Sequence, residues 1–178
     1  MRVFIAVDLP DEAKDYLSDL QEYIRNDGSM KVVDKDKLHL TLRFLGEMND
    51  SEIDKLKDVL KQVKFEKIKA RLGNFGVFTE DYVRVVWISL EPKEKFREMH
   101  EKIDELLEKE KIAKADKFES HITLARVKSI KNKESFLRKI RELKVKPLEF
   151  EVKNFSLKKS IPTRQGHIHE DIITFPGI

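Results

Sequence analysis

Apolar and polar positions along the chain predict one order of strands and helices that occurs twice. An apolar run opens each half, at residues 3–9 and 82–90, and both runs are typical of buried strands. Pro10 and Pro92 follow these runs with acidic residues close behind, which indicates the start of a helix of about 16 residues. Apolar residues then recur at helical spacing: Ala13, Leu17, Leu20 and Ile24 in the first helix, and Phe96, Met99, Ile103 and Leu106 in the second.

Each half continues with a further strand, a second helix and a closing strand. We expect Asp50 and Asn132 to cap the second helices, because their side chains can accept a hydrogen bond from the first turn. This order predicts an α+β protein with two pseudo-symmetric lobes, each a mainly antiparallel sheet backed by helices, around a central cleft. The remaining elements are expected as closing strands at 67–78 and 148–158, a polar turn at 162–166 and a last strand at 168–175.

The two halves are related by a constant offset in the sequence. The tetrapeptides His-Leu-Thr-Leu at 39–42 and His-Ile-Thr-Leu at 121–124 lie 82 residues apart. We therefore predict one bilobal domain over residues 1–178, with an internal repeat of roughly 2–80 and 82–160 followed by a short tail. The same offset also aligns Arg2-Val3 with Arg84-Val85, Pro10 and Glu12 with Pro92 and Glu94, and Asp50 and Glu52 with Asn132 and Glu134.

Composition narrows the class of protein without indicating a function. The 178 residues are 40% apolar and 39% charged, which is typical of a globular protein with a sizeable core. The absence of cysteine excludes disulfides, a thiolate nucleophile and cysteine-ligated zinc. No apolar run approaches the roughly 18 residues of a membrane span, and the N-terminus does not resemble a signal peptide, so we expect a cytoplasmic protein. A net charge of +3 allows a polyanionic partner without requiring one.

Each His-x-Thr tetrapeptide places an imidazole and a hydroxyl on one face of a strand. Because residues two apart point the same way, His39 lies beside Thr41 and His121 lies beside Thr123. A pseudo-twofold between the halves would bring both pairs together. Two imidazoles can supply the base and the acid that open a phosphodiester, and the hydroxyls can stabilise charge on its oxygens. This chemistry requires neither a metal nor another cofactor.

A structural role is the usual explanation for a single histidine in a strand. Here two of the five histidines occupy matched positions in two similar segments. Chance is a poor explanation of that coincidence, and the pattern favours a catalytic pair.

Paired His-x-Thr motifs in a duplicated α+β chain resemble the 2H phosphoesterase superfamily. The segments at 2–10, 38–46 and 121–126 are similar to its LigT/ThpR branch, the RNA 2′,3′-cyclic phosphodiesterases first described as 2′-5′ RNA ligases. The resemblance implies a bilobal fold and hydrolysis of a terminal 2′,3′-cyclic phosphate to a 2′-phosphate, with RNA ligation as its reverse. It also implies that His39 is the proton donor and His121 the proton acceptor.

The expected partner is RNA with a 2′,3′-cyclic phosphate end, with tRNA fragments among the candidates. We expect no membrane partner and a monomer. Two alternatives stay open, which are action on a small cyclic nucleotide such as ADP-ribose 1″,2″-cyclic phosphate and a non-catalytic RNA-binding function.

Three residues near the motifs are candidate substrate contacts. Arg43 shares a face with His39 by strand alternation, and an arginine fork suits phosphate. Arg126 has the opposite parity from His121 unless a bulge reorients it, but the family resemblance favours it as a cleft residue. Phe44 could stack on a base, although core packing is the favoured role.

Four other residues are weaker candidates for the site or are expected outside it. His167 and His169 form a His-x-His pair whose spacing could bind a metal, but no further ligand set completes such a site. His169 also replaces a tyrosine common in the family, and Trp87 is followed by Ile-Ser where members often have glycine. We expect Trp87 in the core and His100 in a structural role on its helix.

Overall fold

The structure is a computed structural model that describes residues 1–78 and 82–178. None of the helices within these ranges is long and apolar enough to cross a membrane. The elements in chain order are β1 (Arg2–Asp8), α1 (Asp11–Ile24), β2 (Gly28–Val32), β3 (His39–Glu47), α2 (Asp50–Leu60), β4 (Ile68–Phe78), β5 (Val85–Glu91), α3 (Lys93–Lys109), β6 (His121–Ile130), α4 (Lys133–Glu142), β7 (Glu149–Val152), β8 (Asn154–Thr163) and β9 (Gly166–Pro176).

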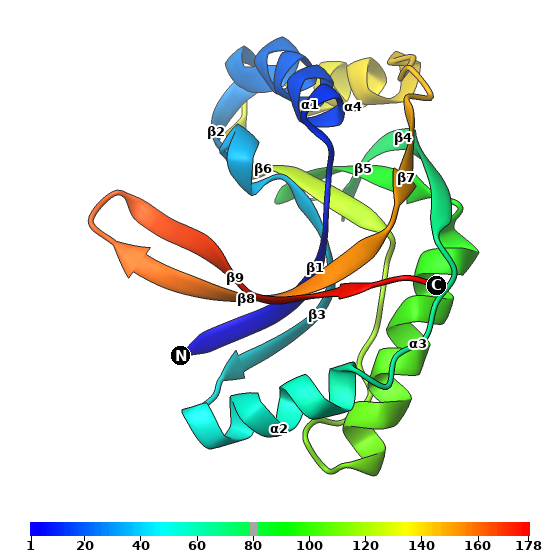
Figure 1. Ribbon diagram of the computed structural model, residues 1–178. Coiled ribbons are helices and arrows are strands. Elements are labelled where there is room, and N and C mark those ends of the chain that lie inside the picture. Colours follow the sequence, from blue (N-terminus) through cyan, green and yellow to red (C-terminus); the bar gives the residue numbers. More distant parts are fainter. Residues whose placement is uncertain (79–81) are drawn as a thin grey trace.

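The strands pair antiparallel in one continuous, curled sheet (Figure 1). Its order is β7-β4-β5-β6-β3-β1-β8-β9, and β2 pairs with β6. The predicted α+β class is confirmed, but the expectation of two separate sheets is wrong because β3 and β6 pair with each other. Within the described residues this junction is a single pair, Leu40 with Ile122. Such a short junction leaves the sheet free to bend between its two sides.

The junction of β3 and β6 divides the sheet into two sides, and equivalent strands follow in the same order on each side. On one side come β6, β5 and β4, and on the other come β3, β1 and β8. Chain order matches β1 with β5, β3 with β6 and β4 with β8. Each side therefore takes two strands from one half of the chain and its third strand from the other half. The internal repeat stays a prediction, but its halves do not correspond to separate lobes.

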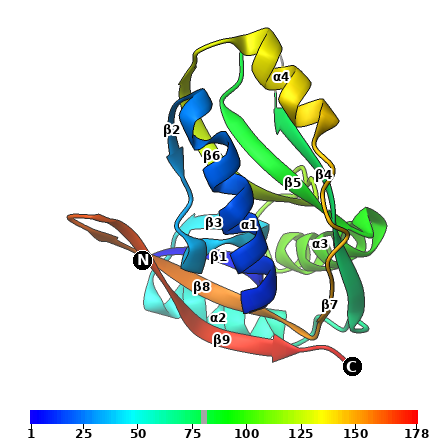
Figure 2. The same ribbon diagram turned by 90° about the horizontal axis from the view of Figure 1, so that it is seen from above.

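The helices form two groups that pack on the sheet (Figures 1 and 2). α1 and α4 lie together at the end that holds β2 and β6, whereas α2 and α3 pack against each other at the opposite end. The predicted apolar face of α1 is buried, as are the first three predicted positions of α3. Leu106 is only half-buried, and Leu107 fills the core position instead. Helical periodicity therefore located both helices and missed one core residue.

The second helices begin at asparagine caps. Asn49 accepts a hydrogen bond from Glu52 N at 2.9 Å, and the Glu52 carboxylate accepts one from Asn49 N at 2.7 Å. This capping box makes Asn49 the cap of α2, one residue before the predicted Asp50. The predicted cap of α4 is confirmed, since Asn132 accepts from Ser135 N at 2.9 Å.

The closing strand predicted at 148–158 is two strands, because β7 pairs with β4 whereas β8 pairs with β1. The tail is a hairpin of β8 and β9 that projects from the body in Figure 1. β8 continues to Thr163, so the turn is shorter than the predicted 162–166. The hairpin carries the last histidines of the chain back toward the start of β3.

Candidate active site

The two His-x-Thr strands meet where Leu40 of β3 pairs with Ile122 of β6. Both of these side chains are buried in the core. Because faces alternate along a strand, the residues on either side of each one point the other way. A cleft of about 730 Å³ lies on that face, and its lining includes all four predicted residues: His39, Thr41, His121 and Thr123.

The ring of His39 has a hydrogen-bond partner at each nitrogen. Nδ1 lies 2.6 Å from the carbonyl oxygen of Lys37, and Nε2 lies 2.8 Å from Thr41 Oγ1. A carbonyl oxygen only accepts, so Nδ1 carries the proton, and Nε2 of the neutral ring accepts from the threonine hydroxyl. Phe4 and His169 pack around the ring with centroids 5.3 and 5.6 Å away. Nε2 is thus the nitrogen that can exchange a proton with a bound molecule.

His121 is oriented in the same way. Its Nδ1 lies 2.8 Å from the carbonyl oxygen of Glu119, which is again two residues before the histidine. Phe78 approaches the ring edge-on at 4.9 Å, and Trp87 lies 6.4 Å away. Trp87 is half-buried beside this ring, which corrects its expected core position. The carbonyl groups that orient the two histidine rings belong to the backbone, so the residue types in the sequence could not predict them.

Burial lowers the pKa of both imidazoles. The pKa of His39 falls from 6.5 to about 4, mainly through burial and further through the nearby His169 and Lys158, while the hydrogen bond to Lys37 opposes the shift. The pKa of His121 is also lowered, again mainly by burial. Both rings are therefore neutral near pH 7 in the ligand-free protein. A bound anion would raise these pKa values and so favour a proton on one ring.

Each strand has a β-bulge at the last residue of its tetrapeptide. The register of β3 against β1 shifts at Leu42, and the register of β6 against β5 shifts at Leu124. A bulge reverses the alternation of faces beyond it. Arg43, expected on the face of His39, is therefore buried, and Phe44 is 68% exposed.

Phe44 and Arg126 occupy equivalent positions beyond the two bulges, each five residues after the histidine of its strand. Both side chains are exposed and line the cleft. For Phe44 this corrects the favoured expectation of core packing. For Arg126 the bulge supplies the reorientation that simple alternation does not.

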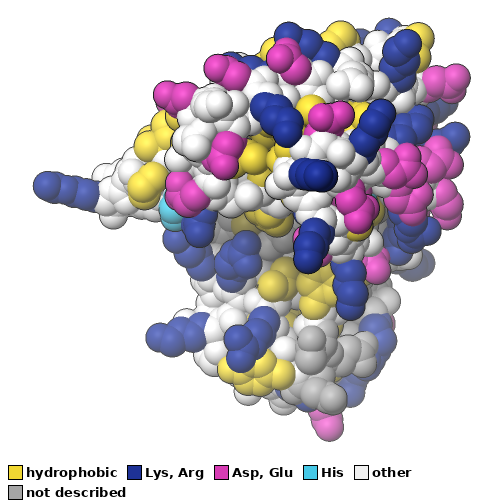
Figure 3. Space-filling view, turned by 90° about the horizontal axis from the view of Figure 1, so that it is seen from below, with side chains coloured by type: hydrophobic (Ala, Val, Ile, Leu, Met, Phe, Trp, Pro, Cys, Tyr) yellow, Lys and Arg dark blue, Asp and Glu magenta, His cyan; other side chains and the backbone are white. Residues whose placement is uncertain are grey.

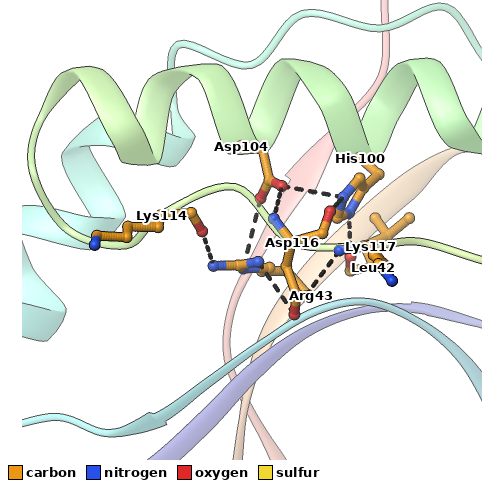
Figure 4. A network of polar contacts seen from close by, with 7 residues as sticks. All are labelled: Leu42, Arg43, His100, Asp104, Lys114, Asp116 and Lys117. Carbon is orange, nitrogen blue, oxygen red and sulfur yellow. Dashed lines mark hydrogen bonds and ion pairs between the residues drawn. The ribbon is translucent and has the colours of Figure 1, made fainter.

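Arg43 lies in a network of ion pairs and a hydrogen bond, in which Asp104 is buried and Asp116 is exposed (Figure 4). Its Nε is 3.5 Å from Asp104 Oδ1, its Nη1 is 3.3 Å from Asp116 Oδ2, and it also donates to Lys114 O. Arg43 and Asp104 are each only 7% exposed. The guanidinium is thus surrounded by protein partners, and a contact between Arg43 and substrate stays a prediction.

His100 connects α3 to the strand of the first motif. Its Nδ1 lies 2.7 Å from the carbonyl oxygen of Leu42, the bulge residue. Its Nε2 lies 3.0 Å from Asp116 O and 3.1 Å from Asp104 Oδ2, and the ring stacks on Phe118 at 4.8 Å. Both nitrogens of this buried ring therefore bond to neighbouring segments and hold them together, which is a structural role.

The two histidines of β9 both line the cleft but have different neighbours. The ring of His169 packs against Phe4 at 4.9 Å and borders His39. Nδ1 of His167 pairs with Ser160 Oγ at 3.1 Å. Among the described residues, no group of three or more His, Asp or Glu side chains is arranged to hold a metal ion.

The lining of the cleft is basic. Figure 3 shows Lys and Arg side chains gathered around a hollowed part of one face, with hydrophobic side chains between them. Such a wall favours a phosphate-bearing ligand. The cations that line the cleft are Arg2, Lys31, Lys37, Arg43, Lys117 and Arg126, against the acids Asp34, Asp116 and Glu119.

Known proteins are similar to this chain in sequence and in fold. Residues 9–160 match the profile of the 2′-5′ RNA ligase superfamily. An RNA 2′,3′-cyclic phosphodiesterase of Methanocaldococcus jannaschii is 36% identical over 175 residues, which cover 97% of this chain and 98% of the relative. One of Archaeoglobus fulgidus is 31% identical over 178 residues, covering 98% of this chain and 99% of the relative.

Solved structures agree with the fold. A Thermus thermophilus protein superposes with a TM-score of 0.81 at 29% identity, covering 99% of this chain and 97% of that one. E. coli LigT in its apo form superposes with a TM-score of 0.79 over 99% of this chain and 96% of that one. At 22% identity the second likeness shows the fold alone.

Proposed function

The chain belongs to the 2′-5′ RNA ligase superfamily, and from this premise we propose that it hydrolyses a terminal 2′,3′-cyclic phosphate on RNA to a 2′-phosphate. The observation that carries the proposal is the pair of His-x-Thr faces that line one basic cleft. The near full-length relatives named RNA 2′,3′-cyclic phosphodiesterase, at 31% and 36% identity, support the choice of substrate.

Hydrolysis requires one proton to leave the attacking water and another to reach the leaving oxygen. In this proposal Nε2 of His121 takes the proton of the water as its oxygen attacks phosphorus. The bond from phosphorus to O3′ breaks, and Nε2 of His39 gives that oxygen its proton. The product has a 2′-phosphate and a 3′-hydroxyl, and proton exchange with solvent resets the two rings. With a 5′-hydroxyl in place of the water, the same attack on the cyclic phosphate would break the bond to O3′ and form a 2′-5′ linkage, with the same two proton transfers.

The proton donor must be charged when the substrate is bound. The pKa of His39 is about 4 without ligand, so this ring is a poor donor on its own near pH 7. A cyclic phosphate is an anion, and its charge beside the ring raises the pKa of the imidazole. The donor role of His39 therefore belongs to the complex with substrate rather than to the ligand-free protein.

Protonation of His39 also changes what Thr41 can do. In the neutral ring Nε2 accepts from the Thr41 hydroxyl across 2.8 Å. A protonated Nε2 can no longer accept, so the hydroxyl hydrogen can turn to a non-bridging phosphate oxygen. Thr123 occupies the matching position two residues after His121. Both hydroxyls are proposed to stabilise the charge that builds on these oxygens in the transition state.

Phe44 and Arg126 are proposed to contact the RNA around the terminal phosphate. Phe44 is exposed on one wall of the cleft, where an aromatic face can stack on a base. Arg126 is exposed on the opposite strand, and no ion pair within the described residues occupies its guanidinium. An arginine in that state can bind phosphate through two parallel hydrogen bonds.

The test is hydrolysis of a short RNA with a 2′,3′-cyclic phosphate end, in excess EDTA, with identification of the product. We expect a 2′-phosphate from the wild type and at least a roughly 100-fold loss of kcat in His39→Ala and in His121→Ala. The pH dependence of kcat and of kcat/KM would separate the ring states with and without substrate.

Three outcomes distinguish the alternatives. Turnover of ADP-ribose 1″,2″-cyclic phosphate but not of RNA would move the substrate to small cyclic nucleotides. RNA binding without turnover, weakened in both histidine variants, would mean a non-catalytic binding protein. Activity that EDTA abolishes and a divalent metal restores would contradict the two-histidine mechanism.

A further inference from the structure

A helix side chain satisfies the carbonyl of each bulge residue. The extra residue of a bulge falls out of the strand ladder, so its polar groups need other partners. On β6, the carbonyl oxygen of Leu124 accepts from Gln21 Nε2 of α1 at 2.8 Å and from Val33 N at 2.9 Å. On β3, the carbonyl oxygen of Leu42 accepts from His100 of α3 at 2.7 Å. On the two sides of the sheet, different side chains thus donate a hydrogen bond to the carbonyl oxygen of the bulge residue.

Both N–H groups of the Gln21 side-chain amide donate hydrogen bonds in this arrangement. Its second hydrogen bond runs from Nε2 to the carbonyl oxygen of Val33 at 2.7 Å, just after β2 ends. The side chain is 3% exposed, so water cannot replace these bonds. A flipped amide would point its oxygen at two carbonyl oxygens, so one orientation is fixed. Gln21 therefore joins the end of β2 to the bulge of β6 in a single geometry.

That geometry determines where two cations lie. Arg126 is two residues beyond the bulge, and its backbone pairs with Lys31 on β2. Both side chains are exposed and line the cleft. Like charges on facing positions of neighbouring strands repel each other. Hydrogen bonds of the backbone and of Gln21, rather than attraction between the side chains, hold this pair together.

We propose that Gln21 is a positioning residue that directs Arg126 at a phosphate group of the bound RNA. Gln21 itself is not part of the cleft lining and touches no reacting atom. The inference rests on the proposed function, because that function makes Arg126 a substrate contact. Its consequence is that removal of the Gln21 amide weakens substrate binding through Arg126 and leaves the imidazoles and hydroxyls in place.

The test is a double-mutant cycle between Gln21→Met and Arg126→Ala on cyclic-phosphate RNA. Methionine keeps the length and bulk of glutamine and removes the donor. We expect Gln21→Met alone to raise KM about tenfold while kcat stays within about twofold. In the Arg126→Ala background the same change should raise KM less than about twofold, because the residue it acts through is gone.

The matched control is the same cycle with Phe44→Ala, whose strand is fixed by His100 instead. There the two effects should multiply, because neither residue acts through the other. Gln21→Asn, whose amide is one methylene too short to reach both carbonyls, replaces Gln21→Met if that variant does not fold.

An equal effect of Gln21→Met with and without Arg126 would overturn the proposal, as would a loss confined to kcat. The cycle is repeated as a dissociation constant for an RNA that ends in a 2′-phosphate, measured by fluorescence anisotropy. This version requires no turnover. Absence of hydrolysis by the wild type would therefore count against the proposed function, while the binding cycle still decides the role of Gln21.

Discussion

The ring of His169 stands edge-on to the ring of His39, with their centroids 5.6 Å apart and an interplanar angle of 77°. An imidazole from the C-terminal hairpin therefore closes one side of the pocket around a candidate catalytic histidine. The pKa of His169 is itself lowered, by burial first and then by Lys37 and Lys158. The β8–β9 hairpin thus affects the electrostatic environment of His39 at the β3–β6 junction, although the two segments are far apart in sequence.

Replacement of His169 by alanine should raise the pKa of His39 from about 4 toward 6.5. Two causes act in the same direction, since the change admits water to the ring and removes a neighbouring group that can carry positive charge. The pKa of His39 would be measured by NMR titration of its ring. His167→Ala is the control, because His167 pairs with Ser160. An unchanged pKa in His169→Ala would contradict this account.

The low pKa of His39 should also make stability depend on pH. The unfolded ring takes up its proton near pH 6.5, whereas the folded ring does so only near pH 4. Between these values the unfolded state binds more protons than the folded state. The free energy of unfolding is therefore unaffected by the titration of His39 above pH 6.5 and decreases as the pH falls to 4. The change amounts to ~3 kcal/mol at most.

His39→Asn isolates that contribution from those of the carboxylates. Urea unfolding of wild type and variant from pH 7 to pH 4 should show the difference in unfolding free energy moving in favour of the variant. A difference that stays constant over this range would show that burial does not perturb His39 in this way.

Arg43→Ala should destabilise the protein by about 3–5 kcal/mol, because it removes the guanidinium that pairs with the buried Asp104 carboxylate. Both partners are only 7% exposed, so solvent screens the pair little. Removal of both charges, in Arg43→Met with Asp104→Leu, should cost less than Arg43→Ala alone. Urea unfolding measures these differences. A large rise in KM with little change in stability would instead support the substrate contact expected from the sequence.

Much of the site could be predicted because it lies before the bulges. From His39 to Thr41 and from His121 to Thr123 the strands alternate regularly, so a period of two assigns the correct faces. The bulges at Leu42 and Leu124 have no signature in residue type, and beyond them the same rule failed.

The arrangement of the strands could not be predicted in the same way. Periodicity reports which face of an element is apolar, but it does not name the neighbouring strand. The exchange that places β4 beside β5, and β8 beside β1, was therefore missed. β2 was missed for a local reason, since none of its side chains is fully buried and its sequence has no clear alternation. Asn49 was missed because Asp50 is an equally good capping residue one position later.

Phe44→Ala should weaken binding of RNA without weakening the fold. The ring is 68% exposed and lies 6.1 Å from that of Phe4, so its loss should change the free energy of unfolding by less than about 0.5 kcal/mol. Stacking on one base is worth ~1–3 kcal/mol, which corresponds to a rise in KM of roughly 5- to 150-fold.

A substrate without its terminal base provides the matched control for Phe44. On cyclic-phosphate RNA with an abasic last nucleotide, wild type and Phe44→Ala should have the same KM, because the group that stacks is absent. On the intact RNA the variant should be weaker, and Phe44→Tyr should stay close to the wild type. If Phe44→Ala loses the same factor on both RNAs, the ring shapes the cleft wall and does not bind a base.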